Sequence, residues 1–276
     1  MTKIRLDILL FERGLAESRE RAKAVIMSGK VFIGGIRAEK PGMKFDPYVD
    51  VDVRGGCQYV SRGGQKLEKA LSFFGVSPKG KVCIDCGAST GGFTDCLLKN
   101  GAKLVYAVDV GYGQLAWSLR SDPRVVAMDR TNVRFMKPDM IEIKPSLAVI
   151  DVSFISLGLV LPAARGLLAG DGEAICLIKP QFEAGREKVG KKGVVRDPAT
   201  HKEVLDTFLV NSEQSGFCAK GLSFSPVKGP EGNIEYLGWL GCSGEWRVFD
   251  TEAVVIESHK ELGNCGSREG ENYTVP

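Results

Sequence analysis

The sequence predicts an α/β fold, with a mostly parallel sheet and helices on both of its faces, preceded by a small α+β module. From about residue 60 onward, apolar runs alternate with helix-like segments, which is the pattern of a doubly wound sheet. The first 58 residues differ, because they combine two helical segments with a Gly-Gly turn and an alternating apolar strand. A chain of 276 residues is long enough for one large and one small domain.

The domain limits follow from these patterns. We expect the small module at residues 1–58 with a linker at about 54–61, and the α/β domain at residues 59–261. The remaining residues, 262–276, are rich in Gly and polar side chains and show no periodicity, so they are expected to form a flexible tail.

The small module is predicted to contain two helices and a small sheet. The first helix covers residues 5–14, and the second begins after Ser18, a good N-cap, and ends at Gly29. A strand VFI, a tight turn at residues 34–35, a loop at 36–42 and a last strand within 49–55 complete the module. Basic residues gather on and after the second helix, namely Arg19, Arg21, Lys23 and Lys30.

Charge and composition restrict the class of protein. The net charge is only +3, and residues 1–60 hold 11 Lys and Arg against 8 Asp and Glu, so the excess lies in the small module. This asymmetry hints at a polyanion as partner. Acidic residues interrupt the first apolar run, and no uncharged run is long enough to cross a bilayer, so we expect a cytoplasmic protein.

The eight cysteines are scattered, several within apolar runs, which indicates buried free thiols. Cys83 and Cys86 form a single CxxC with no second pair or neighbouring His, so no metal site is expected. Histidine-based catalysis has little support either, because the chain has only His201 and His259.

The predicted strands of the large domain all end at a charged residue. The strands VCID, LVYAVD, RVVAMD, LAVID and AICLIK end at Asp85, Asp109, Asp129, Asp151 and Lys179. Ligands of open parallel sheets bind outside the carboxyl ends of the strands, so these side chains are expected to face one crevice. A single Asp in this position is usually a helix cap or a turn residue, and two of the series remain open to that interpretation.

The stretch DCGASTGGFTD at residues 85–95 links the first of these strands to a helix. It lacks the Gly-Lys-Ser/Thr of a phosphate loop, and its glycine spacing does not fit the dinucleotide fingerprint. The glycines instead permit close approach of a compact ligand, and the carboxylates at the strand ends favour S-adenosylmethionine. Asp109 is placed to hold ribose hydroxyls, and Asp129 to accept from the adenine amino group. The predicted cofactor-binding residues are Asp85, Gly87, Ser89, Thr90, Gly91, Gly92, Phe93, Asp109, Val110, Asp129, Arg130 and Asp151.

Two lysines and two carboxylates make a candidate catalytic set: Lys66, Asp151, Lys179 and Glu235. A ribose 2′-hydroxyl is a poor nucleophile and must lose its proton as a methyl group arrives. A lysine can accept that proton only if burial or a neighbouring cation lowers its pKa, and the second lysine would supply such a cation. The alternatives are an exposed helix lysine at 66, an ordinary strand-end ion pair at 151 and 179, and a turn carboxylate at 235.

These residues resemble the Lys-Asp-Lys-Glu tetrad of the FtsJ-like 2′-O-ribose methyltransferases. The chain as a whole resembles the TlyA (hemolysin A) family, through segments such as YVSRGGQKL, DCGASTGGFTD, LAVIDVSFISL, LIKPQFE and GNIEYL. The resemblance implies methylation of cytidine 2′-hydroxyls in ribosomal RNA with S-adenosylmethionine as methyl donor. It also implies Lys179 as the base, Asp151 and Glu235 as orienting residues, and Lys66 as a positioner of the ribose.

Residues 5–54 resemble the S-four-type RNA-binding domain, through RLDILL, the basic second helix, a KPG turn and the closing strand. The resemblance implies that the small module binds RNA, and the basic loop GREKVGKKGVVRDP would then be a second RNA contact. The predicted RNA-binding residues are Arg5, Arg19, Arg21, Lys23, Lys30, Arg62, Arg186, Lys188, Lys191 and Lys192. The alternative for both regions is a solvated basic surface.

Two rival functions remain. A membrane-lytic protein, which the hemolysin name suggests, would need a membrane-spanning or amphipathic membrane segment, and the sequence shows none. A non-catalytic RNA-binding protein would not need the four catalytic candidates. Phe154, Phe182 and Trp239 are expected in the core or a pocket wall and not as platforms on which bases stack.

Overall fold

The computed structural model describes residues 3–16, 18–53 and 58–263 of the chain. It divides into two compact units, one formed by Met1–Glu68 with Ser77–Asn132 and the other by Lys69–Val76 with Val133–Pro276. The predicted linker residues 54–57 and tail residues 264–276 lie outside the described residues.

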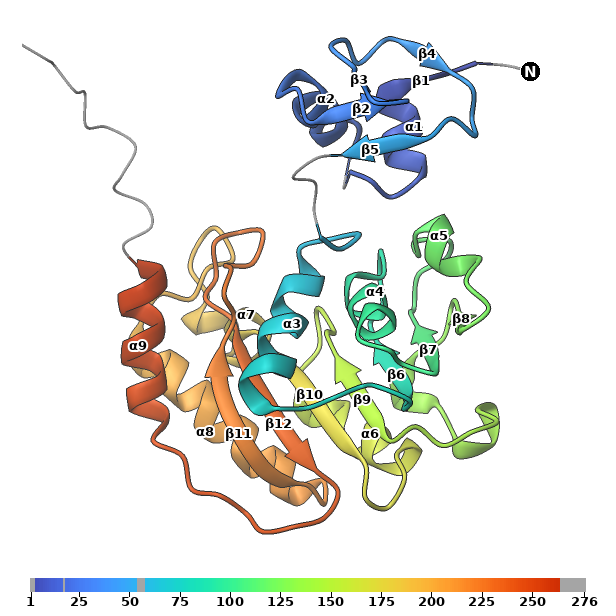
Figure 1. Ribbon diagram of the computed structural model, residues 1–276. Helices are drawn as coiled ribbons and strands as arrows, with labels where there is room; N and C mark the ends of the chain where they lie inside the picture. Colours follow the sequence, from blue (N-terminus) through green and yellow to red (C-terminus); the bar gives the residue numbers. More distant parts are fainter. Residues whose placement is uncertain (1–2, 17, 54–57, 264–276) are drawn as a thin grey trace, which may run out of the picture. The chain divides into compact units, whose positions relative to one another are not determined.

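The small N-terminal module contains two short helices and two small sheets (Figure 1). Its elements are β1 (Ile4–Arg5), α1 (Leu6–Glu12), α2 (Arg19–Met27), β2 (Val31–Ile33), β3 (Ile36–Arg37), β4 (Lys44–Phe45) and β5 (Val51–Val53). Strand β2 lies between β3 and β5, and β1 pairs with β4, both sheets being antiparallel. The two helices, the first strand and the closing strand agree with the sequence prediction.

Local sequence explains most of these boundaries. The Ser18 hydroxyl accepts a hydrogen bond from the Arg21 N–H at 3.1 Å and so caps α2. Gly34 and Gly35 both have positive φ, +55° and +81°, which is the geometry of a type I′ hairpin turn. The predicted loop over residues 36–42 is wrong at its start, because Ile36 and Arg37 form β3 and close that hairpin. The β1–β4 pair was not predicted either.

The module has its own apolar core, in which Leu6, Leu10 and Ile26 are fully buried. Asp7 is also fully buried, and its carboxylate accepts from Arg5 at 2.9 Å and from Arg19 at 3.3 Å. The Arg5 guanidinium is the main reason that the pKa of Asp7 falls to about 2. Two of the predicted RNA-binding arginines are therefore held in place by one buried carboxylate.

The first half of the large sheet belongs to the first unit. Strands β6 (Val82–Cys86), β7 (Leu104–Val108) and β8 (Val125–Met128) are parallel and in register as β6–β7–β8. Helix α3 (Gly63–Phe74) precedes β6, α4 (Gly92–Lys99) connects β6 to β7, and α5 (Trp117–Arg120) comes before β8. Each parallel connection therefore passes through a helix, as the alternating sequence pattern predicts.

The second unit carries the other four strands. Strand β9 (Leu147–Ile150) is parallel to β10 (Glu173–Ile178), whereas β12 (Tyr236–Gly241) is antiparallel both to β10 and to β11 (Cys218–Phe224). The strand order of the seven-stranded sheet is β11-β12-β10-β9-β6-β7-β8. The predicted fold class is confirmed. Strand β12 is the reversed strand between β10 and β11, near one edge of a mostly parallel sheet.

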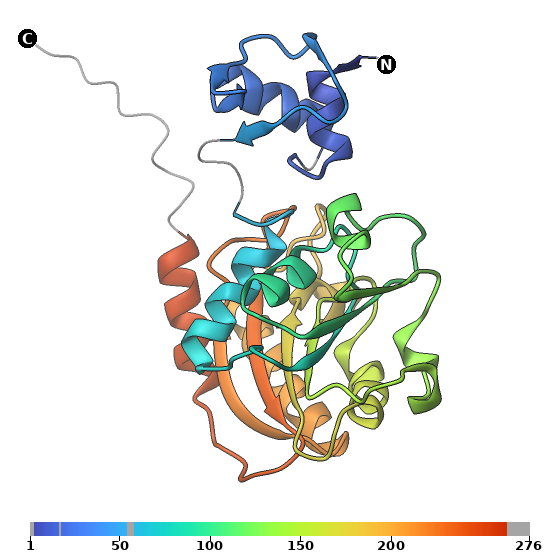
Figure 2. The same cartoon turned by 45° about the vertical axis from the view of Figure 1, so that its right-hand side comes forward.

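Helices of the second unit pack on its strands. Helices α8 (Pro198–Gln214) and α9 (Thr251–Gly263) lie side by side against β11 (Figures 1 and 2). The remaining helices are α6 (Leu161–Leu167), α7 (Pro180–Glu183) and the 3₁₀ turns Val133–Phe135, Pro138–Met140, Leu157–Leu159 and Arg186–Lys188. Asp197 caps α8 by accepting from the N–H groups of Ala199 and Thr200.

Six cysteines lie in the described part of the chain, and all of them are free thiols. Cys83 and Cys86 are buried on β6, and no group of three or more His, Cys, Asp or Glu side chains suited to a metal occurs among the residues that were described. Burial raises the pKa of the Cys83 thiol to about 12. Cys83 and Cys86 therefore behave as small core residues.

A pair of histidines, His201 and His259, joins α8, α9 and β12. His201 is fully buried; its Nδ1 lies 2.8 Å from the Tyr236 hydroxyl and 3.1 Å from His259 Nε2. Its Nε2 lies 3.1 Å from the carbonyl oxygen of Val195. Since a carbonyl only accepts, His201 carries its proton on Nε2, and Nδ1 is the acceptor for its neighbours.

This pair makes stability dependent on pH. Burial lowers the pKa of His201 from 6.5 to about 4, so the unfolded chain binds a proton more tightly than the folded chain. The free energy of unfolding should therefore fall as the pH drops from about 6.5 to about 4, by at most about 3 kcal/mol from this group. Urea unfolding at several pH values measures the slope, and His201→Gln should flatten it. An equal slope in that variant would assign the effect to other groups.

Candidate active site

The loop after β6 is built around residues with left-handed backbone. Gly87, Ser89 and Gly91 have φ values of +94°, +49° and +96°. A Cβ on Gly91 would lie 2.3 Å from Leu119 Cδ1 and 2.7 Å from Leu115 Cδ1, so only glycine fits there. Helix α4 then begins at Gly92, with the loop leading into its N-terminus. The loop is therefore packed closely against Leu115 and Leu119 before it enters α4.

Asp109 holds this loop to the end of β7. Its Oδ2 accepts from the Ser89 N–H at 2.7 Å, and its Oδ1 accepts from the Gly111 N–H at 2.7 Å. Both oxygens keep a second lone pair, which is the acceptor that a diol would need. Val110, the next residue, is 69% exposed beside it.

Other predicted cofactor residues make contacts within the fold. Asp85 lies inside β6, fully buried, and its Oδ2 accepts from the Thr94 hydroxyl of α4 at 2.6 Å. Phe93 is buried in α4. The Asp129 carboxylate accepts from Arg120 at 2.8 and 2.7 Å, so an adenine amino group would share it with that guanidinium. Arg130 has φ +52° and stacks over the Tyr112 ring at 4.5 Å.

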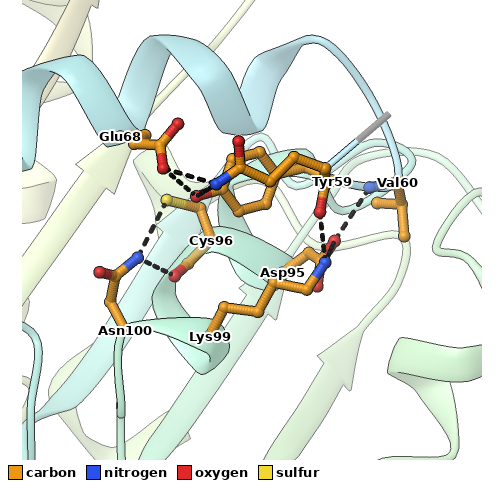
Figure 3. Close-up of polar contacts among 8 residues, drawn as sticks. Tyr59, Val60, Glu68, Asp95, Cys96, Lys99 and Asn100 are labelled. Atoms are coloured by element: carbon orange, nitrogen blue, oxygen red, sulfur yellow. Dashed lines mark hydrogen bonds and ion pairs between the residues drawn. The ribbon is translucent and has the colours of Figure 1, made fainter. Parts of the chain in front are cut away.

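A polar cluster fixes the segment that enters α3 (Figure 3). The Val60 N–H donates to Asp95 Oδ2 at 2.9 Å, and Lys99 donates to the same oxygen at 3.0 Å and to the Gln58 carbonyl at 2.5 Å. The Tyr59 hydroxyl donates to Glu68 Oε1 at 2.9 Å. The start of α3 is therefore tied to α4, the helix that follows the glycine loop.

Glycines let these segments approach each other. A Cβ on Gly64 would lie 2.1 Å from Tyr59 Cγ, and one on Gly92 would lie 2.2 Å from Ser61 Oγ and 3.0 Å from the Gly64 nitrogen. Lys66 lies in the first turns of α3 and is only 8% exposed. The alternative of an exposed helix lysine at this position is therefore wrong.

Asp151 and Lys179 follow the neighbouring parallel strands β9 and β10, and they form an ion pair. Lys179 Nζ lies 2.5 Å from Asp151 Oδ1, 3.1 Å from the Val152 carbonyl oxygen and 3.0 Å from Ser153 Oγ. Lys179 is 8% exposed. Burying an ammonium group is costly unless polar or charged partners surround it. The three oxygen atoms around the Lys179 amine offset this cost.

Glu235 directly precedes β12 and is 1% exposed. Its carboxylate lies against Gly229, where an added Cβ would come within 2.5 Å of Oε1. The Glu235 carbonyl accepts from the Ser225 N–H at 2.8 Å, which joins this position to the end of β11. Glu235 is therefore a buried carboxylate directly before β12.

The aromatic residues divide into two groups. Trp239 stacks on Phe74 at 5.8 Å and donates from Nε1 to Glu173, as expected for a packed side chain. For Phe154 the expectation is wrong: the side chain is 90% exposed and its backbone has φ +62°. The left-handed turn three residues after Asp151 directs this ring outward, 5.0 Å from the Phe182 ring.

Most of the predicted RNA-binding residues are exposed, on the small module, before α3 and in the basic loop. Arg19, Arg21 and Lys30 on the module, Arg62 before α3, and Arg186, Lys188, Lys191 and Lys192 in the basic loop are exposed, while Arg5 and Lys23 are half-buried. Lys188 forms an ion pair with Glu203. Arg196, which the sequence prediction did not include, lines the same hollow as Lys188, Lys191 and Lys192.

Comparison with known proteins places the chain in a family. The model of the "FtsJ-like methyltransferase" family matches residues 59–242, and the model of the "S4 domain" matches residues 4–48. The chain belongs to the FtsJ-like methyltransferase family. It carries an S4 domain ahead of the methyltransferase domain, as the sequence predicts.

Two curated relatives cover nearly the whole chain. "Putative rRNA methyltransferase YqxC" of Bacillus subtilis is 55% identical over 94% of this chain and 95% of its own. "16S/23S rRNA (cytidine-2'-O)-methyltransferase TlyA" of Mycobacterium tuberculosis is 45% identical over 94% of this chain and 97% of its own. A solved structure titled "Putative hemolysin from Streptococcus thermophilus" is 48% identical, with a TM-score of 0.74 over 95% of this chain and 98% of that one.

The cofactor of this FtsJ-like methyltransferase is S-adenosylmethionine. The residues present fit it, because the Asp109 carboxylate at the end of β7 offers acceptors for a ribose diol. Across the described residues, no helix is long and apolar enough to cross a membrane.

The methyltransferase should lose cofactor affinity when Asp109 is replaced. Asp109→Ala removes acceptors for the Ser89 and Gly111 N–H groups, and a charged hydrogen bond of this kind is worth about 1.5–3 kcal/mol. We expect the Kd for S-adenosylmethionine to rise by about 10- to 100-fold in calorimetric titration. Asp122→Ala is the control, because Asp122 pairs only with nearby Arg124. Equal affinity in both variants would remove Asp109 from the cofactor site.

Proposed function

We propose that the chain transfers the methyl group of S-adenosylmethionine to ribose 2′-hydroxyls of ribosomal RNA, with cytidine as the target nucleoside. The observation that carries the proposal is the buried Lys179–Asp151 pair at the carboxyl ends of adjacent parallel strands. Two curated relatives of known or assigned rRNA methyltransferase activity, at 55% and 45% identity, support the substrate class. With ribosomal RNA as substrate, the enzyme would work in the cytoplasm.

In this mechanism Lys179 accepts the proton of the 2′-hydroxyl. Its ammonium form donates to the Val152 carbonyl oxygen and to Ser153 Oγ, and it forms an ion pair with Asp151. The neutral amine donates only two hydrogens and keeps a lone pair, so it would hold two of these acceptors and turn the lone pair toward the hydroxyl. Asp151 keeps the amine in position throughout. S-adenosylmethionine, when bound, supplies the methyl group for the in-line displacement.

The other two candidates have supporting roles. Lys66 is proposed to position the ribose or to stabilise the oxygen as it loses its proton, and Glu235 to orient a lysine amine. Both are buried ionisable side chains, which are retained at a cost in stability and are common at active sites. Positioning of this kind does much of the work in an in-line displacement.

Exposed Phe154 fits the same proposal. An outward ring beside the Lys179–Asp151 pair, resting on Phe182, can stack on an unpaired base. Base stacking on an aromatic side chain is worth about 1–3 kcal/mol. The basic residues of the S4 domain and of residues 186–196 would hold the RNA backbone.

The test is methyl transfer from labelled S-adenosylmethionine to ribosomal subunits and to naked rRNA. A 2′-O-methyl group makes the adjacent phosphodiester bond resistant to alkali, so labelled dinucleotides after alkaline hydrolysis would identify the product. Label confined to bases, or no label in any rRNA, would overturn the proposal. Leakage of liposomes caused by the pure protein would instead favour the membrane-lytic alternative.

A further inference from the structure

Residues 186–196 form a closed cationic loop. The Gly190 N–H donates to the Val194 carbonyl at 3.1 Å, and the Gly193 N–H donates to the Gly190 carbonyl at 2.8 Å. The loop surrounds an open hollow of about 540 Å³, lined by Lys188, Gly190, Lys191, Lys192, Val194 and Arg196. Lys191, Lys192 and Arg196 form no ion pair within the part of the chain that the structure describes. Their charges are thus available to a polyanion.

The Asn233 side chain holds this loop by two hydrogen bonds to its backbone. Its Oδ1 accepts from the Val195 N–H at 2.9 Å, and its Nδ2 donates to the Gly193 carbonyl at 2.9 Å. Asn233 is 1% exposed, and the mechanism above makes no use of it. His201 adds a third bond, from Nε2 to the Val195 carbonyl at 3.1 Å.

The same asparagine belongs to the turn that carries Glu235. Its carbonyl accepts from the Gly229 N–H at 2.9 Å, and Gly229 is the residue against which the Glu235 carboxylate rests. Strand β12 begins directly after Glu235, at Tyr236. The Tyr236 hydroxyl lies 2.8 Å from His201 Nδ1. One buried amide therefore joins the cationic loop to the backbone that fixes a candidate catalytic carboxylate.

We propose that Asn233 is a positioning residue that locks the cationic loop at residues 186–196 to the Glu235 turn, so that RNA bound by the loop is aligned with the catalytic carboxylate. The inference rests on the proposed function for its RNA ligand. One of the two bonds needs an acceptor and the other a donor, and the side-chain amide supplies both. A carboxylate would face the Gly193 carbonyl with like partial charges and leave that carbonyl without its donor.

Asn233→Asp tests the anchor with an almost isosteric change. Limited trypsin digestion of the free protein measures the loop directly, through the rate of cleavage after Lys191 and Lys192. We expect this rate to rise at least about tenfold, with the affinity for S-adenosylmethionine unchanged. Asn100→Ala is the matched control: it also removes an amide that donates to a backbone carbonyl, that of Cys96 at 2.8 Å, and it should leave loop cleavage unchanged.

Methylation kinetics test the coupling. Asn233→Asp should raise KM for rRNA about tenfold and also lower kcat, whereas Lys191→Ala with Lys192→Ala should raise KM alone. If Asn233 acts through the loop, its effect on KM should largely disappear in the Lys191→Ala, Lys192→Ala background, while the effect on kcat persists.

Three results would overturn the inference. The first is wild-type loop cleavage in Asn233→Asp. The second is an equal loss of S-adenosylmethionine binding and thermal stability, which would make Asn233 a general structural residue. The third is a KM effect that adds fully to that of the lysine changes. If Asn233→Asp does not fold, Asn233→Ser undergoes the same digestion. Absence of rRNA methylation by the wild type would defeat the proposed function, while the trypsin result still decides whether Asn233 anchors the loop.

Discussion

Replacing Lys179 by Ala is expected to lower the rate of methyl transfer by about 10²- to 10⁴-fold, the usual contribution of a positioned general base. Lys179 Nζ lies 2.5 Å from Asp151 Oδ1, in an ion pair between two members of the candidate set. Removing the amine leaves the 2′-hydroxyl without its proposed proton acceptor. The measurement is single-turnover methylation with saturating S-adenosylmethionine.

Binding of S-adenosylmethionine to the Lys179→Ala variant should be largely unchanged, because the glycine loop and Asp109 do not depend on Lys179. Lys179→Arg distinguishes a role of the positive charge from a role as base. The guanidinium keeps the positive charge, but it stays protonated and cannot accept the proton of the hydroxyl. This variant should be as inactive as the alanine variant. Lys220→Ala serves as control, as Lys220 lies on β11 and contacts Glu173 and the Trp239 ring. Equal losses of cofactor binding and rate in Lys179→Ala would contradict the base role.

The sequence was sufficient for five strands of the large sheet, β6 to β10, because their signal is local, whereas β11 was not predicted. Each is a short apolar run bounded by a charge, and Asp109, Asp129, Asp151 and Lys179 each come directly after a strand in the structure. Strands β1, β3 and β4 were missed because two-residue strands carry no periodicity of their own. Only the partner across the sheet makes Ile36 and Arg37 a strand.

Side-chain surroundings were harder to predict than positions along the chain. Asp129 forms an ion pair with Arg120 on α5, nine residues earlier. No sequence pattern around either residue predicts this ion pair. Phe154 looked like an ordinary core aromatic, but the positive φ at that position turns it to solvent. Asn233 carries no signal as an anchor, because its two partners are backbone groups about 40 residues away, at Gly193 and Val195.

Burial is what the structure adds to the catalytic candidates. Lys66, Lys179 and Glu235 are 8%, 8% and 1% exposed, although charged residues of these types are mostly found at the surface. A sequence pattern can place these residues at strand ends and helix starts, but it does not show whether they are buried. The structure shows that they are buried, which costs free energy of folding. That cost is the physical reason to treat them as functional residues.

Gly229→Ala should lower the methylation rate by about 10²-fold while leaving the fold intact. A Cβ at this position would lie 2.5 Å from Glu235 Oε1 and 3.1 Å from its Cδ, so one of the two must move. The carboxylate is the end of a flexible side chain, whereas the backbone of Gly229 is bonded to the Asn233 carbonyl. The carboxylate will therefore shift, at little cost in stability, and a displacement of about 1 Å is enough to impair catalysis.

Gly166→Ala is the matched control for this variant, because a Cβ there meets no atom within 4 Å and the residue lies inside α6. It should keep full activity and gain about 0.5–1 kcal/mol in the free energy of unfolding, as alanine does in a helix. Thermal unfolding checks that Gly229→Ala folds. In the Glu235→Gln background, Gly229→Ala should have almost no further effect, because the carboxylate that it displaces is already inactive. If the two changes reduce the rate independently, the glycine affects catalysis by some route other than Glu235, and the orienting role assigned to that carboxylate loses its structural support.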